Sequence, residues 1–140
     1  LIGTYNNYKE GNKIDNVISG QSLSIIISYY SNFSQIKNVI IGLVITNSLG
    51  QFLAVLNNKM SNFDFKILPG KGEIKCVIKK LPLMSGIHFL NVNLNVNGTK
   101  EDYIEAAKRF YVDNADYYSS GYPNAHNRQG IYIDQEWMSY

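Results

Sequence analysis

The segment from Ile87 to Val96 alternates apolar and polar side chains more regularly than any other part of the chain. In an extended strand, residues two apart share a face of the sheet. Such alternation is typical of a β-strand with one face on the core and the other on the surface. The face predicted to point inward holds Leu90, Val92, Leu94 and Val96, and the outward face holds Phe89, Asn91, Asn93 and Asn95.

Shorter segments of strand-like pattern recur along the whole chain, separated by clusters of Gly, Pro, Asn and Ser. Further strands are expected at residues 4–8, 22–30, 39–46, 52–56, 72–81, 109–112 and 130–140. Residues 101–108 are expected to hold one helical turn, and residues 57–71 and 117–129 are expected to be loops. Seven or eight short strands without a long helix predict an all-β fold, an antiparallel β-sandwich.

Composition supports one packed core. The chain has 140 residues, of which 45% are hydrophobic and 17% are charged. Its longest apolar run, residues 39–45 with Gly42 inside, is far shorter than the roughly 18 residues that a membrane span needs. The net charge is only +2, and the cations are scattered, which argues against nucleic acid as a partner. We expect residues 1–140 to form a single domain of a longer chain.

The residues that hold metals and cofactors are scarce. A single cysteine, Cys76, excludes an internal disulfide and a cysteine-based zinc site. His88 and His126 are far apart in sequence, and the position of His88 in a strand favours partial burial over metal binding. Residues 69–72 lack the spacing of a phosphate-binding loop and precede a predicted strand rather than a helix. We expect no metal and no cofactor.

Groups that could support catalysis lie in predicted loops. Ser119 and Ser120 could be combined with Asp116 and His126, but no nucleophile-elbow motif surrounds either serine. The neighbouring carboxylates have the loop context of solvated charges rather than of an acid–base pair. These observations predict that the chain is not an enzyme.

The three asparagines on the outward face of the 87–96 segment, here called the amide row (Asn91, Asn93 and Asn95), are the strongest candidate for a binding function. Amides both donate and accept hydrogen bonds, as sugar hydroxyls do, and Asn is depleted from strands in general. Phe89, Tyr111 and Arg109 are expected on the same face, where a ring could stack on a pyranose. The alternative is a solvated strand face with ordinary cross-strand pairs.

One ordered series of motifs resembles a known family. It runs through residues 20–25, 41–45, 47–50 and 72–78, then residues 81–90, 110–112 and 130–132, and ends near Trp137. Its most specific part is Leu-Pro-Leu at residues 81–83, followed by Ser-Gly at 85–86 and the alternating strand. This series is similar to the C-terminal domain of Wzt, the ATPase subunit of ABC transporters that export O-antigen polysaccharide.

The resemblance implies an immunoglobulin-like β-sandwich that binds a glycan on the concave face of one sheet, at the cytoplasmic side of a bacterial inner membrane. It also implies an ATPase domain elsewhere in the parent protein, and a homodimer in which residues 130–140 exchange between protomers. By position, the carbohydrate-binding residues would be Asn91, Asn93, Asn95, Arg109, Tyr111, Phe89, Thr46, Val44 and Gly42.

The sequence thus predicts a non-catalytic carbohydrate-binding domain that recognises an exported O-antigen-type polysaccharide, with Gly42 allowing close approach of the ligand. The alternative is a structural β-sandwich that acts as a protein–protein interaction or dimerisation module, through its apolar strands and the tail around Trp137.

Overall fold

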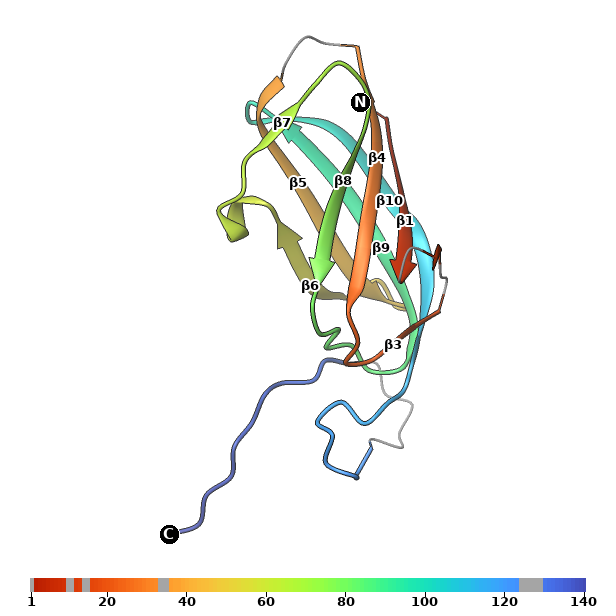
Figure 1. Cartoon of the computed structure of the whole chain (residues 1–140), viewed down its shortest axis with the longest axis vertical. Coiled ribbons are helices and arrows are strands. Elements are labelled where there is room, and N and C mark those ends of the chain that lie inside the picture. The colour runs from red at the N-terminus through yellow and green to blue at the C-terminus, as the bar shows by residue number, and fades with distance from the viewer. Residues whose placement is uncertain (1, 10–11, 14–15, 33–35, 124–129) are drawn as a thin grey trace.

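The computed structural model describes residues 2–9, 12–13, 16–32, 36–123 and 130–140. Within these residues the chain is all-β, with ten strands and one short 3-10 helix (Figure 1). The strands are β1 (Ile2–Lys9), β2 (Asn12–Lys13), β3 (Asn16–Ile18), β4 (Leu23–Ser31), β5 (Ile36–Asn47), β6 (Phe52–Asn57), β7 (Phe65–Ile67), β8 (Gly70–Ile78), β9 (Gly86–Val96) and β10 (Thr99–Asp113), and the helix is η1 (Lys59–Ser61). Seven of these strands have six or more residues, within the expected range.

The strands form two sheets that face each other (Figure 1). The smaller sheet has the order β2-β1-β4-β8, and the larger has the order β3-β10-β9-β5-β6, with β7 also paired to β5. The predicted all-β sandwich is therefore confirmed. The expectation of purely antiparallel pairing is wrong at one place, because β3 runs parallel to the end of β10.

The core lies between the sheets and is built from the alternating residues of the long strands. In β4, Leu23, Ile25 and Ile27 are buried, while Ser24 and Ile26 between them are only partly buried. In β9, Leu90, Val92 and Leu94 point into the same core. Residues 39–47 of β5 are buried on both faces except for the partly buried Ile40, because β5 lies between β9 and β6. The predicted inward and outward faces of β9 are thus confirmed.

The predicted helical turn at residues 101–108 is wrong, because this segment belongs to the fifteen-residue strand β10. The pairing of β10 with β9 shifts register twice, between Lys100 and Asp102 and between Ile104 and Lys108. Ile104 lines a core cavity and Ala107 packs against the core. These two inward residues are three apart, which is a helical spacing produced here by an irregular strand.

The expected loop at residues 57–71 contains η1, β7 and the start of β8. The buried side chain of Asn58 holds this segment against β5. Its Oδ1 accepts a hydrogen bond from Ile41 N at 2.9 Å, and its Nδ2 donates to Val39 O at 3.0 Å. A polar side chain supplies the contact, so no apolar pattern marked the segment as ordered.

The segment after residue 129 forms no strand within its own chain beyond a single bridge between Ile131 and Leu83. Tyr132 anchors its root, because its ring stacks on Tyr117 at 4.5 Å and its backbone N–H donates to Pro82 O at 2.7 Å. Residues 133–140 then leave the sandwich as an extended tail (Figure 1). Of the helices in the described residues, none has the length and hydropathy to cross a membrane.

Candidate functional site

Strand register brings the predicted binding residues of β5 and β9 onto one surface. We call this surface, the side of the larger sheet that points away from the smaller one, the outer face. Directly opposed residues of an antiparallel pair have neighbouring side chains on the same face. The register opposes Thr46 to Phe89, Val44 to Asn91, Gly42 to Asn93, and Ile40 to Asn95.

Strand β10 adds the predicted Arg109 and Tyr111 to this surface. Arg109 lies opposite Phe89, and Tyr111 lies opposite Ile87. The side chains of both residues are exposed, whereas that of Phe89 is partly buried. Sequence periodicity had assigned these three residues to one face, and the register of β9 and β10 places them together there.

Asn91 differs from the other two members of the amide row. Its side chain is only 6% exposed, and its Oδ1 accepts a hydrogen bond from the backbone N–H of Ala106 at 2.8 Å. The register passes from the Ile104–Val92 pair directly to the Lys108–Leu90 pair, which leaves residues 105–107 opposite Asn91. The Asn91 side chain thus satisfies a backbone donor that the irregular strand cannot pair in the usual way.

Asn93 lies across the backbone of β5, at the position that Gly42 leaves open. A Cβ atom added to Gly42 would lie 2.5 Å from Oδ1 and 2.6 Å from Nδ2 of Asn93. The absence of a side chain at Gly42 thus lets the Asn93 amide approach the backbone of β5. Asn93 and Asn95 are both partly buried. Each retains an accessible part of a side chain that can donate and accept hydrogen bonds.

Two residues that the sequence prediction missed, Tyr103 and Lys100, extend the outer face. Tyr103 lies opposite Asn93 and is 45% exposed, and Lys100 lies opposite Asn95. The Lys100 Nζ is 4.7 Å from the centre of the Tyr103 ring, a cation–π contact. Tyr103 was missed because the segment containing it was assigned to a helical turn, and a helix would not have opposed it to β9.

The floor and one margin of the outer face are apolar. Val44 and Thr46 are buried, so they support the surface more than they present it. Their partners in β6 are exposed: Val55 lies opposite Val44, and Phe52 lies opposite Thr46. The strand that forms this margin was predicted from the sequence, because residues 52–56 were expected to pair with residues 39–46.

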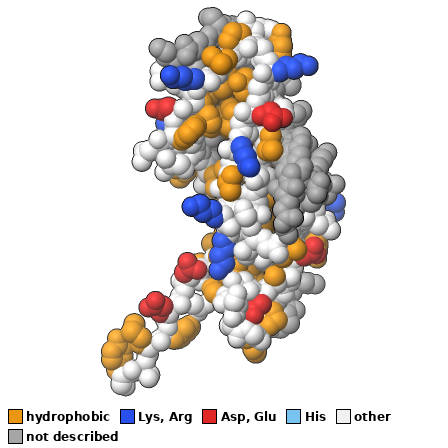
Figure 2. Space-filling model, viewed as in Figure 1, with side chains coloured by type: hydrophobic (Ala, Val, Ile, Leu, Met, Phe, Trp, Pro, Cys, Tyr) orange, Lys and Arg blue, Asp and Glu red, His pale blue; other side chains and the backbone are white. Residues whose placement is uncertain are grey.

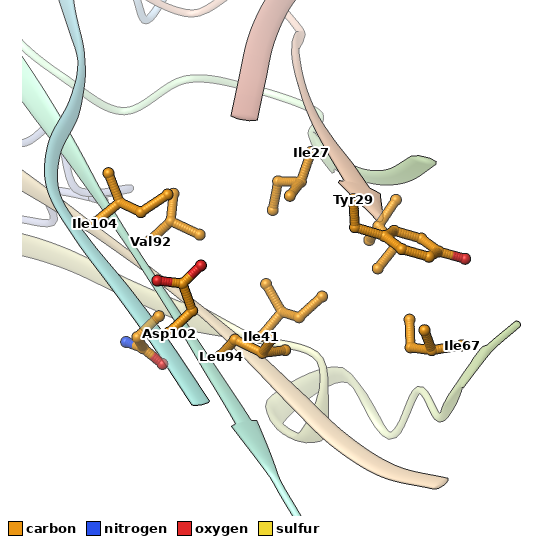
Figure 3. A pocket seen from close by; sticks show the side chains of 10 residues that line it. Ile27, Tyr29, Ile41, Ile67, Val92, Leu94, Asp102 and Ile104 are labelled. Carbon is orange, nitrogen blue, oxygen red and sulfur yellow. The ribbon is translucent and has the colours of Figure 1, made fainter. Parts of the chain in front are cut away.

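Two hollows lie between the sheets rather than on the outer face. The larger, a groove of about 320 Å³, opens beside β8 and is lined by side chains that include Leu43, Phe63, Phe65, Cys76 and Val77. Figure 2 shows the apolar side chains that gather along this side of the sandwich. The smaller cavity, about 30 Å³, is lined by ten residues, of which five are isoleucines. In Figure 3, Asp102 lies beside Val92 and Ile104 at this cavity.

His88 belongs to the core and not to the outer face. It is fully buried, more than the partial burial expected, and its ring stacks on that of Phe110 at 5.6 Å. Its Nδ1 lies 2.9 Å from Gly86 O, and its Nε2 has no hydrogen-bond partner among the described residues. Burial lowers the pKa of His88 below its ordinary value, because the apolar surroundings disfavour the charged ring.

In the loop after β10, Asp116, one of the residues considered for catalysis, stabilises the backbone of the loop. The Asp116 carboxylate accepts hydrogen bonds from the backbone N–H groups of Ser120 and Gly121, at 3.1 and 2.7 Å, which closes the loop. His126, the proposed base, lies outside the described residues. Within the described part of the chain, no three His, Cys, Asp or Glu side chains come together in a way that could hold a metal ion.

The fold and the outer face together define a class: a β-sandwich domain whose larger sheet presents amides, aromatic rings and an arginine on one surface. A comparison with protein families matches residues 4–124 to the Wzt C-terminal domain. This match covers most of the chain, and the chain therefore belongs to the Wzt C-terminal domain family.

Solved structures agree with this assignment at the level of the fold. A structure described as the crystal structure of the C-terminal domain of wzt has a TM-score of 0.76 and 15% sequence identity, over 97% of this chain and 81% of that chain. The DNA glycosylase AlkC of Pseudomonas fluorescens, bound to DNA with an abasic site analogue, has 14% identity over 79% of this chain and 30% of that chain. Its TM-score of 0.45 is too low to support an argument. A comparison with curated proteins gives no match.

Proposed function

We propose that this chain is a carbohydrate-recognition domain that binds an exported O-antigen-type polysaccharide on the outer face and catalyses no reaction. The observation that carries the proposal is the convergence of exposed aromatic rings, accessible amides and Arg109 on one surface of a domain of the Wzt C-terminal family. Membership of the family alone would not identify the surface that binds the ligand, and the polar sheet face alone would not identify the class of ligand.

Each group on this surface has a chemical role in the proposal. Asn93 and Asn95 donate hydrogen bonds to hydroxyl groups and accept hydrogen bonds from them. Tyr111, Phe89 and the newly found Tyr103 offer rings on which the apolar side of a pyranose can stack. Asn91 acts as a positioning residue, because its Oδ1 is already bonded to Ala106. Such an open surface retains water, so we expect weak binding, on the order of micromolar to millimolar.

The proposed setting follows from the family. The chain would be one domain of the ATPase subunit of an O-antigen ABC transporter, at the cytoplasmic side of a bacterial inner membrane. The ATPase domain would supply the energy for transport, and this domain would select the polysaccharide. This division of labour assigns no catalytic group to the outer face.

The test is an NMR titration of the isotope-labelled chain with the surface polysaccharide of the bacterium that makes it. We expect chemical shift changes at Asn93, Asn95 and Tyr111, and loss of binding in Asn93→Ala with the melting temperature within a few degrees of the original. Ser24→Ala, on the other sheet, is the control and should bind normally. No shift changes at millimolar sugar would contradict carbohydrate recognition.

A second function, dimerisation through the C-terminal tail, is favoured by a separate observation. Trp137 is 88% exposed, and Ile133, Met138 and Tyr140 are also exposed, although such side chains are normally covered. We propose that this tail is exchanged with a second copy, where an apolar groove such as the one beside β8 could receive it.

The test of dimerisation compares the molar mass in solution of the full chain with that of a chain ending at Ile133. The shorter chain keeps the Tyr117–Tyr132 stack that anchors the root of the tail. We expect a dimer for the full chain and a monomer for the shorter one. A full chain that is monomeric at high concentration, or a shorter chain that remains dimeric, would contradict exchange of the tail.

A further inference from the structure

Strand β6 (Phe52–Asn57) forms one edge of the larger sheet (Figure 1). One side of β6 pairs with β5, and none of the described strands pairs with its other side. The unpaired backbone groups of an edge strand can pair with another chain, and proteins prevent this with short edge strands, charged side chains, proline or bulges. The edges of the two sheets can therefore be compared by how far each is protected.

Most edges of the two sheets are protected. The edge strands β2, β3 and β7 have only two or three residues each. The longer edge strand β8 carries the exposed charged residues Lys71, Glu73 and Lys75. Strand β6, by contrast, has six residues, and residues 47–58 around it include no charged residue and no proline. Among the described edges, β6 is therefore the one most open to another strand.

Large apolar side chains are exposed along the same edge. Phe52 and Val55 of β6 are 69% and 53% exposed, and Leu49, in the turn before β6, is 82% exposed. Apolar residues exposed singly are common, but a row of them beside an open strand edge is typical of a surface that contacts another protein. A partner strand at this edge would cover these side chains and pair the free backbone groups.

The β6 edge is complementary to a second copy of itself. Its register shift lies near Leu53, so residues 54–57 pair regularly with β5 and can be extended by a further strand. Two such edges related by a two-fold axis perpendicular to the sheet run antiparallel, and directly opposed residues then lie on the same face. A residue on the axis meets its own copy, so a charged residue there would meet a like charge. With the exposed Val55 on the axis, only neutral side chains of β6 meet.

We propose that the β6 edges of two copies pair antiparallel around Val55, so that their larger sheets join into one continuous sheet. This inference rests on the proposed dimerisation and adds a second contact between the same two copies. The pairing would place both outer faces on one side of the joined sheet. Five strand spacings of about 4.8 Å would separate the two β9 strands, so the two amide rows would be about 24 Å apart.

The edge contact is expected to be weak on its own. Two paired six-residue strands cover much less than the roughly 800 Å² per partner that a stable interface buries. Exchange of the tail would hold the two copies at a high effective concentration, which allows their edges to pair. A chain without the tail should therefore be monomeric even though its β6 edge is intact.

The first experiment tests the geometry by disulfide cross-linking of the full chain. Cys76, the single cysteine, is replaced by serine, and Val55→Cys is introduced. Opposed residues of an antiparallel pair have Cα atoms about 4.5 to 5.5 Å apart, within the range that a disulfide spans. With oxidised glutathione, Val55→Cys should form a covalent dimer about tenfold faster or more than Leu68→Cys. Leu68, which is 58% exposed between β7 and β8, is the control position.

The second experiment tests whether neutral side chains must meet at the axis. Val55→Lys places two like charges opposite each other and should raise the dissociation constant of the full-chain dimer about tenfold or more. Val55→Glu should have the same effect, but an equal mixture of the two variants should form mixed dimers nearly as stable as the original, because opposite charges then meet. Leu68→Lys is the matched control and should dimerise as the original chain does. Analytical ultracentrifugation measures the dissociation constants, and a melting temperature close to the original shows that each variant is folded.

The outcomes separate this inference from the exchange of the tail. If Val55→Lys dimerises as well as the original chain, or Val55→Cys cross-links no faster than Leu68→Cys, the edge pairing is overturned and exchange of the tail stands. If Val55→Cys cross-links as fast in a chain ending at Ile133 as in the full chain, the edge pairing stands without help from the tail. A full chain that is monomeric at high concentration and does not cross-link overturns both.

Discussion

The two faces of strand β9 are made from neighbouring residues and have opposite properties. On the inner face, His88, Leu90, Val92 and Leu94 are buried, and the His88 ring is left with one nitrogen unpaired among the described residues. On the outer face, Phe89, Asn93 and Asn95 keep accessible surface, and Asn91 is buried. The core thus contains a polar atom, His88 Nε2, that has no partner among the described residues. The regular amide row, in turn, contains one asparagine, Asn91, that is not available to a ligand.

This difference shows that the partner strand decides what a residue does. Asn91 and Asn93 are the same residue type, two positions apart, on the same face of the same strand. Asn91 faces the irregular part of β10 and binds the Ala106 backbone, whereas Asn93 faces Gly42 and lies over β5. Alternation in one strand assigns a face, and the register of its neighbours assigns the role.

The largest expected effect on stability is at the inner face. Leu90→Ala should lower the free energy of unfolding by about 2 to 5 kcal/mol, because Leu90 is 1% exposed and its removal leaves a cavity. Phe89→Ala removes a larger side chain from the outer face and should cost less. Chemical denaturation of both variants measures the two losses. A larger loss of unfolding free energy for Phe89→Ala than for Leu90→Ala would contradict the proposed difference between the two faces.

The next effect separates the two asparagines. Asn91→Ala should cost about 1 kcal/mol or somewhat more, because it removes a buried side chain together with the hydrogen bond that its Oδ1 accepts from the backbone N–H of Ala106. Asn93→Ala, the matched control, should change the free energy of unfolding by less than about 0.5 kcal/mol. Equal losses in denaturation experiments would mean that the amide row is structural throughout, and the proposed binding surface would lose its central residue.

Much of this arrangement could be predicted from sequence. The strands at residues 22–30, 39–46 and 87–96 were predicted in the right places, and the last of them with the correct faces, because in them the apolar residues follow a period of two or run continuously. Alternation placed Phe89, Arg109 and Tyr111 on the face of the amide row, and the family resemblance added the β5 residues by making β5, β9 and β10 neighbours. The local pattern was sufficient wherever the strand was regular.

What could not be predicted depends on contacts between distant segments. The irregular register of β10 is stabilised by Asn91 from β9, and the order of residues 57–63 by the Asn58 side chain on β5. The parallel pairing of β3 with β10 joins residues about a hundred positions apart. Neither an irregular strand nor a side-chain-to-backbone contact leaves a periodic signal, which is why Tyr103 was missed.

A smaller effect, visible only in acid, tests the inner face again. Burial lowers the pKa of His88 in the folded chain, while the unfolded value is about 6.5. Below this pH the unfolded chain binds a proton that the folded chain does not, so stability should fall as the pH drops from about 6.5 towards the folded pKa. His88→Leu should lose less stability than the original chain between pH 7.5 and pH 5, as measured by urea denaturation. Parallel pH profiles would show that other groups cause the acid sensitivity.

Gly42→Ala, which should change stability little, is the sharpest test of the outer face. The atoms nearest to the new Cβ all belong to the Asn93 amide, at 2.5 to 2.9 Å, so the flexible side chain must turn away while the strand backbone remains in place. We expect the free energy of unfolding to change by less than about 1 kcal/mol, since the cost of moving Asn93 is offset by the lower backbone entropy of alanine in the unfolded chain. Binding of polysaccharide should weaken as much as in Asn93→Ala, and the double variant should bind no more weakly than either single variant, because both changes remove the same amide from the surface. Losses that add in the double variant would show that Gly42 contacts the ligand directly, as the sequence alone suggested, and that Asn93 acts independently of it.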